Sequence, residues 1–138
     1  MLLPKKVKYR KWQTARRDLT KGKVDVRGSE LSFGSFGLKA AAPGRIRSNQ
    51  IEAARKTIAR QMQKTGKMWT RIFPDRPFTQ KGAEVGMGKG KGDPQGYEVE
   101  VFPGRVLFEI DGLGDALAKE ALRKAGAKLP VKTKVIAR

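Results

Sequence analysis

The charge of this chain constrains its fold more than any other feature. Lys and Arg number 31 against 13 Asp and Glu, which gives a formal net charge of +18. So large an excess of one sign destabilises a folded state by self-repulsion unless a polyanion neutralises it. Nucleic acid suits this role best, because a basic protein releases the counterions condensed on its phosphates. The sequence therefore predicts a protein with a nucleic-acid partner.

Two missing residue types exclude several kinds of chemistry. Cysteine and histidine are absent, which removes disulfides, thiolate and imidazole metal sites and every nucleophilic mechanism that needs a histidine base. No apolar run approaches the ~20 residues of a membrane span, and the first residues lack the apolar segment of a signal peptide. We expect a soluble intracellular protein that is not an enzyme and has no metal, cofactor, membrane or homo-oligomeric partner.

Residues 1–28 have the pattern of a basic arm. They hold ten basic residues and only two acids, and they lack helical or strand periodicity. Such a segment cannot bury enough apolar surface to order itself, so we expect it to order only on RNA. Tyr9 and Trp12 stand among the cations and either stack on bases or anchor the arm to the domain. The predicted rRNA contacts of the arm are Lys5, Lys6, Lys8, Tyr9, Arg10, Lys11, Trp12, Arg16 and Arg17.

Residues 29–138 have the pattern of a single α+β domain, a two-layer sandwich with two helices packed on a mostly antiparallel sheet. Apolar residues recur at helical spacing between residues 50 and 64, where Asn49 and Glu52 form an expected capping box. The expected elements are two short strands within 31–40, a helix over 50–64, a strand over 67–73, a hairpin of 97–102 and 105–110, a helix over 115–126 and a strand over 131–136.

A long loop rich in Gly and Pro is expected over residues 74–96, projecting from the domain. Its centre alternates glycine and lysine, but it matches neither nucleotide-binding fingerprint; Lys91 is followed by Gly92 where a P-loop needs Ser or Thr. Alternating Gly and Lys allows close backbone approach to RNA with a cation at every second position. We interpret the loop as RNA-contacting; the alternative is a flexible solvated loop. The residues concerned are Met87, Gly88, Lys89, Gly90, Lys91 and Gly92.

Three further groups of side chains have more than one interpretation. Lys56, Arg60 and Lys64 form a row at four-residue spacing, which is either a solvated helix face or a phosphate-binding ridge. Trp69, Phe73, Phe102 and Phe108 lie on expected strands and belong either to the core or to a base-stacking platform; we expect the core, because the aromatic pattern of an RNA-recognition module is not found. Eight of the thirteen acids lie between residues 84 and 120, and Glu98 and Glu100 share one strand face. Because no nucleophile or base lies beside that pair, we expect it to face a basic neighbour or to point away from RNA.

Several local motifs resemble, in order, the universal family of large-subunit ribosomal protein sixteen of bacteria and organelles. They are residues 1–11 (MLLPKKVKYRK), 33–40 (FGSFGLKA), 50–55 (QIEAAR), 71–77 (RIFPDRP), 87–92 (MGKGKG), 103–109 (PGRVLFE) and 128–133 (KLPVKT). The resemblance implies a two-layer α+β protein in the ribosome, in the cytoplasm or an organelle. It also implies binding to large-subunit rRNA beside neighbouring ribosomal proteins, near tRNA in the aminoacyl site. The arm and the loop over Met87 to Gly92 would reach toward that site.

The chain departs from the family pattern at three places. Gly86 stands where the family commonly has arginine, Tyr97-Glu98 stands where tryptophan and an apolar residue are more usual, and residues 12–30 lack the glycine-rich arginine pattern. Two other classes compete with the ribosomal interpretation: an RNA- or nucleotide-processing enzyme that uses the glycine–lysine loop, and a free basic binder such as an RNA chaperone. The first predicts nucleotide turnover, and the second predicts distribution over many RNAs.

Overall fold

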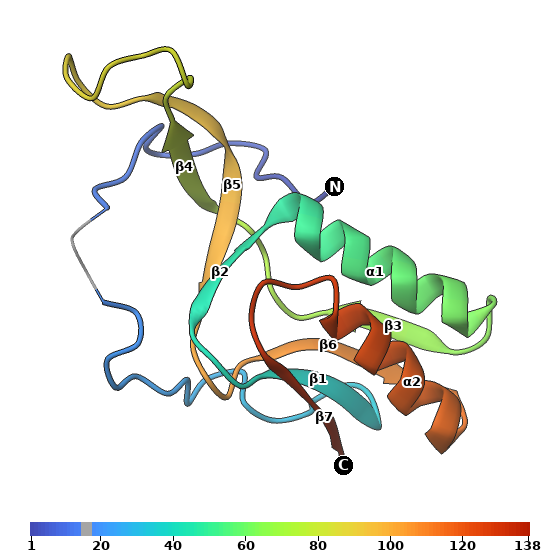
Figure 1. The fold of residues 1–138 in the computed structure, drawn as a ribbon. Helices are drawn as coiled ribbons and strands as arrows, with labels where there is room; N and C mark the ends of the chain where they lie inside the picture. Colours follow the sequence, from blue (N-terminus) through green and yellow to red (C-terminus); the bar gives the residue numbers. More distant parts are fainter. Residues whose placement is uncertain (15–17) are drawn as a thin grey trace.

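A computed structural model describes residues 1–14 and 18–138, and it places two helices on strands that are all antiparallel (Figure 1). The four-stranded sheet has the order β3-β6-β1-β7 and consists of β1 (Phe36–Ala40), β3 (Lys67–Thr70), β6 (Val106–Asp111) and β7 (Thr133–Ala137). The three-stranded sheet has the order β2-β5-β4 and consists of β2 (Gly44–Arg47), β4 (Arg76–Gln80) and β5 (Asp93–Val101). The helices are α1 (Ser48–Met62) and α2 (Asp115–Gly126). The expected α+β class is confirmed, with two sheets in place of one.

The core lies between the two helices and one face of the four-stranded sheet (Figure 1), and the three-stranded sheet adds fully buried Ile46 and Val101 to it. β6 is buried over five consecutive residues, and Phe108 at its centre is fully buried. The helices supply apolar stripes at the expected spacing: Ile51, Ala54, Ile58 and Met62 from α1, and Ala118, Ala121, Leu122 and Ala125 from α2. Leu117, also expected in the stripe of α2, is 42% exposed, so that part of the expectation is wrong. Burial of one large apolar side chain contributes about 1.5–3 kcal/mol, so this layer supplies most of the stability.

The ends of α1 differ from those expected. The helix begins at Ser48, and the Gln50 amide oxygen accepts a hydrogen bond of 2.8 Å from the Arg47 backbone N–H. The expected capping box of Asn49 and Glu52 is therefore wrong, because both residues already lie within the helix. The helix ends at Met62, since the next two residues take left-handed φ angles of 49° and 67°.

The expected hairpin of residues 97–102 and 105–110 is also wrong. The turn exists, with the Arg105 N–H donating to the Phe102 carbonyl at 3.2 Å, but β5 and β6 then enter different sheets. β6 is already paired on both edges by β1 and β3, and β5 is paired on both edges by β2 and β4. β1 and β3 thus take both edges of β6 over residues 108–110, which leaves no edge there for β5. The chain therefore crosses from the three-stranded to the four-stranded sheet at Pro103-Gly104.

The segment expected as a loop over residues 74–96 is a β-ribbon at both ends and a shorter loop between them. β4 and the first half of β5 pair there, and only residues 81–92 connect them without strand structure. Pro77 and Pro94 hide the strands in the sequence, since proline removes a ladder donor. Both are tolerated because β4 is an edge strand and β2 pairs only with residues 98–101 of β5. The ribbon extends away from the helices (Figure 1).

Several smaller expectations also differ from the structure. Residues 31–35 form no strand, and the unexpected β2 follows Pro43. Phe108 is in the core as expected, whereas Phe73 is 44% exposed because β3 ends at Thr70. Trp69 and Phe102 are half-buried. The last strand is shifted by two residues at its start and begins at Thr133.

Candidate nucleic-acid interface

The basic arm and the glycine–lysine loop lie together at the tip of the β4–β5 ribbon (Figure 1). Lys11 Nζ donates to the Lys91 carbonyl at 3.4 Å, and Lys91 Nζ donates to the Trp12 carbonyl. The Arg76 guanidinium on β4 lies 5.6 Å from the centroid of the Trp12 ring, a cation–π contact. Two cationic segments that are about 80 residues apart in the sequence therefore form one surface. The contact favours the anchoring interpretation for Trp12.

The loop is exposed and folded back on one of its own lysines. Lys81 Nζ donates to the Gly88 carbonyl at 2.6 Å and to the Gly86 carbonyl at 3.3 Å. Met87 is 97% exposed at the tip. Lys89 and Gly90 have φ angles of 65° and 94°, and a side chain at residue 90 would be strained by that conformation. Lys81 thus orients a loop in which residues 82–91 are all exposed.

The other predicted rRNA contacts lie mostly on exposed surface. From Lys5 to Trp12 every side chain is exposed and no helix or strand forms, whereas Arg16 and Arg17 lie outside the described residues. Farther along, the Asp25 N–H donates to the Pro103 carbonyl at 2.9 Å and the Val106 N–H donates to the Gly28 carbonyl at 2.8 Å. The end of the arm is therefore tied to the turn between the sheets. Ordering of the arm only on RNA stays a prediction.

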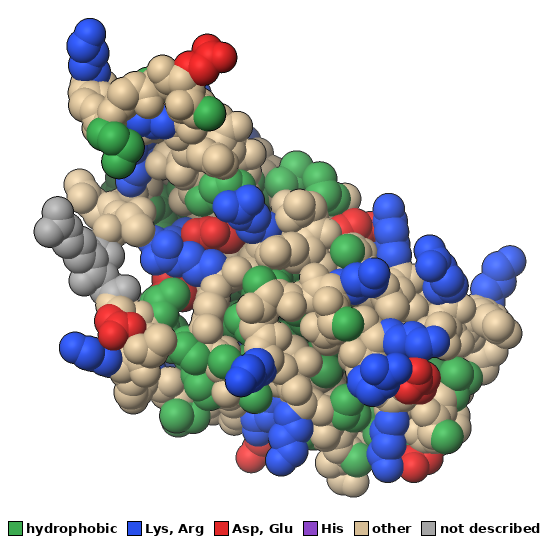
Figure 2. Space-filling view, viewed as in Figure 1, with side chains coloured by type: hydrophobic (Ala, Val, Ile, Leu, Met, Phe, Trp, Pro, Cys, Tyr) green, Lys and Arg blue, Asp and Glu red, His purple; other side chains and the backbone are tan. Residues whose placement is uncertain are grey.

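The row of Lys56, Arg60 and Lys64 is shorter than expected. Lys56 and Arg60 are exposed on α1, but Lys64 follows the end of the helix in a left-handed conformation. The chain begins beside the first turns of this helix (Figure 1). Figure 2 shows Lys and Arg side chains spread over the helical face and at the tip of the loop, with fewer acidic side chains among them.

Two of the three acids of β5 face basic neighbours, as expected. Glu98 and Glu100 lie 3.3–3.8 Å from the guanidinium nitrogens of Arg45 on β2 and Arg76 on β4. Glu98 is buried, and the pairing spans all three strands of the sheet. Among the described residues, no three His, Cys, Asp or Glu side chains are placed to hold a metal ion. These acids therefore neutralise arginines within the sheet.

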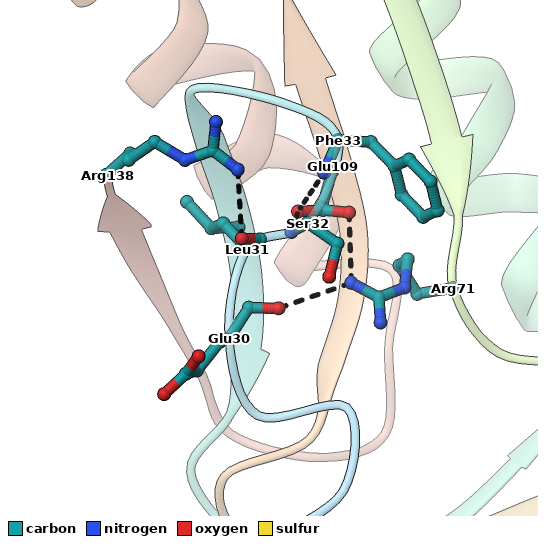
Figure 3. A network of polar contacts seen from close by, with 7 residues as sticks. All are labelled: Glu30, Leu31, Ser32, Phe33, Arg71, Glu109 and Arg138. Carbon is teal, nitrogen blue, oxygen red and sulfur yellow. Dashed lines mark hydrogen bonds and ion pairs between the residues drawn. The ribbon is translucent and has the colours of Figure 1, made fainter.

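A buried carboxylate on β6 escaped the sequence analysis (Figure 3). Glu109 is fully buried and accepts hydrogen bonds from the backbone N–H groups of Ser32 and Phe33, at 2.7 and 3.3 Å. Its other oxygen accepts one of 3.0 Å from Arg71 Nη1. The sequence does contain a signal for this network, which is a single charged residue within the apolar run of residues 106–110. A charge in a fully buried strand needs a partner, so this pattern indicates a buried polar contact.

Two further bonds extend this network to the chain end. Arg71 also donates to the Glu30 carbonyl at 3.3 Å, and Arg138 donates to the Leu31 carbonyl at 3.0 Å. Residues 30–33 are thereby fixed across the face of the four-stranded sheet that lies away from the helices (Figure 3). No helix of the described chain has the length and apolar character needed to cross a membrane.

Comparison with known proteins gives two concordant matches. The model of the family described as ribosomal protein L16p/L10e matches residues 4–136. Large ribosomal subunit protein uL16 of Afipia carboxidovorans is 54% identical over 138 residues, which cover 100% of this chain and 98% of that protein. Both matches span the arm, the two sheets and the loop.

Proposed function

Because the chain belongs to the ribosomal protein L16p/L10e family, we propose that it binds large-subunit rRNA near the aminoacyl-tRNA site and helps to organise tRNA binding there. The family resemblance drawn from the sequence motifs is confirmed. The chain is a structural constituent of the large ribosomal subunit and not an enzyme. Its location is the ribosome in the cytoplasm, and its partners are rRNA and other ribosomal proteins.

The observation that carries the proposal is the meeting of arm and loop at the end of the ribbon. Lys11 and Lys91 exchange contacts there, so the exposed cations of both segments face the same region. Lysine near phosphate supplies affinity without sequence preference, and glycine lets a backbone approach a sugar–phosphate chain closely. This combination suits contact with two RNA chains at one place: rRNA along the arm and tRNA at the loop.

The arm and the loop have different roles in this proposal. The arm is long, exposed and without regular structure, so it follows the irregular surface of rRNA and orders on it. The loop is held by Lys81 on a paired β-ribbon, which fixes its position relative to the domain. A fixed loop is suited to a ligand that arrives and leaves, because little ordering entropy is lost at each binding event.

Large subunits that lack the protein and are then rebuilt with variants test this proposal. The loop variant is Lys89→Ala with Lys91→Ala, and the matched control is Lys119→Ala with Lys124→Ala on α2, which removes the same charge. Both variants should assemble stoichiometrically after a high-salt wash. The loop variant should bind aminoacyl-site tRNA several-fold more weakly than the control. Equal tRNA binding would refute the role of the loop, and loss of the wild type from the subunit would favour a free RNA binder.

A further inference from the structure

The ring of Phe33 lies on the face of the four-stranded sheet away from the helices (Figure 3). Phe33 is 55% exposed, and its ring stacks on that of Trp69, with centroids 5.8 Å apart and planes inclined by 21°. Trp69 is half-buried, so it supports Phe33 from the sheet. One face of the stacked pair is thus covered by protein.

Exposure of a single phenylalanine is common in proteins, so a role for Phe33 depends on how its ring is held. The backbone N–H of Phe33 donates to fully buried Glu109, whose second oxygen is bonded to Arg71. Burial of an ion pair costs several kcal/mol in desolvation, and good geometry only offsets that cost. The fold therefore uses a costly polar network to fix the position of a surface ring.

Cations lie close to the ring. The Arg71 guanidinium lies over the Phe33 ring, 5.3 Å from its centroid. Lys67 precedes Trp69 by two residues on β3, so strand alternation places it on the same face, and its side chain is exposed. The two acids of this face on β6 are bonded to protein donors: Glu109 as above, and Asp111 to the Ser35 hydroxyl at 2.8 Å.

We propose that Phe33 is a stacking site for one unpaired base of single-stranded RNA, with Arg71 and Lys67 on the phosphates that flank it. A ring supported from below and flanked by cations fits a flat base joined to an anionic backbone. A duplex keeps its bases stacked on one another and offers no such face. The inference rests on the proposed function only in naming RNA as the partner.

The test is binding of the full chain to single-stranded oligouridine and to the duplex of oligouridine with oligoadenosine. Phe33→Ala should weaken binding to the single strand by about 5- to 150-fold, the range of one base–aromatic stack. Phe33→Leu should weaken it similarly, whereas Phe33→Tyr should bind as the wild type does. Binding to the duplex should not change in any of the three variants, because phosphate contacts remain.

Phe73→Ala is the matched control. Phe73 is also an exposed phenylalanine, and it follows β3, the strand that carries Trp69 and Lys67. It should leave binding to the single strand unchanged, and thermal unfolding should show that all variants are folded. Wild-type affinity of Phe33→Leu for the single strand would overturn the stacking site, since an apolar contact would then suffice.

The proposed function has a different test, which is the salt dependence of rRNA binding by the wild-type protein. An affinity that does not fall steeply with salt would contradict the proposed function and would leave the result for Phe33 unchanged. With roughly eight phosphate contacts, the slope of log affinity against log salt should be about −7.

Discussion

The two sheets of this protein are stabilised by different interactions. The four-stranded sheet is covered by α1 and α2, and its central strand β6 is buried over five consecutive residues. The three-stranded sheet has mostly half-buried strands, and Glu98 and Glu100 pair with arginines from both neighbouring strands. Apolar burial stabilises the first sheet, whereas charge pairing is prominent in the second.

This difference separates folding from the proposed RNA contacts. The apolar core lies apart from the loop of residues 81–92 and from the exposed part of the arm, so the cations of these segments lie outside it. The loop and arm can then concentrate cations without placing them in the core. Substitutions in the core should therefore lower the free energy of unfolding most, and substitutions in the ribbon should lower it little.

The largest expected effect is that of Phe108→Ala in β6. Truncation of a fully buried phenylalanine creates a cavity and should lower the free energy of unfolding by about 3–5 kcal/mol. The matched change on the ribbon is Phe78→Ala, whose ring is half-buried against Arg47 at 4.5 Å. Urea unfolding measures both. A loss for Phe78→Ala as large as that for Phe108→Ala would contradict the contrast between the sheets.

The next effect concerns the one buried ion pair of the four-stranded sheet among the described residues. Glu109→Leu leaves Arg71 and two backbone N–H groups without their acceptor, and should cost about 3 kcal/mol. Arg71 keeps some exposure to water, which places the cost at the lower end of the range for buried pairs. The double variant with Arg71→Leu should recover part of the loss. Additive losses in this cycle would mean that the pair is not coupled.

The sequence predicted the regions that depend on local spacing. Apolar residues at helical intervals identified both helices and their buried stripes, including Ile51 and Ala54, and the motif order indicated the family. What failed depends on pairing between distant residues. β6 joins the four-stranded sheet because β1 and β3 pair with its two edges. Pro77 made β4 look like a loop in the sequence, although a proline is tolerated there because β4 is an edge strand.

The candidate site was predicted in part for the same reason. Alternating Gly and Lys identified the loop, and the charge density identified the arm, but neither shows that Lys11 meets Lys91. That contact depends on the path of β4 and β5, which the sequence presented as a loop. Glu109 was visible only as a charge in an apolar run, and its partners lie 38 and 77 residues away. Long-range contacts of this kind leave no local pattern.

A smaller effect is expected in the ribbon. Glu98→Gln removes one of two carboxylates that share Arg45 and Arg76, so Glu100 still pairs with both, and the loss should be about 1 kcal/mol. The loss should shrink as salt is added, because partly exposed pairs are screened. Unfolding at low and high salt measures this. The control Glu120→Gln removes an exposed pair on α2 and should have almost no effect. A loss for Glu98→Gln that does not change with salt would point to packing in place of charge.

The smallest effect is a pH dependence on the helical side of the molecule. Hydrogen bonds from Arg55 lower the pKa of Glu52 from 4.5 to about 2. A carboxylate whose pKa is lower in the folded state stabilises it above pH 4.5, and this contribution is lost as the pH falls from about 4.5 to about 2. Unfolding curves of wild type and Glu52→Gln should therefore converge over that interval and differ by a constant amount above it. A difference in unfolding free energy that does not change with pH would show that Glu52 acts through packing. Charge pairing between Glu52 and Arg55 would then not contribute to the stability of α1.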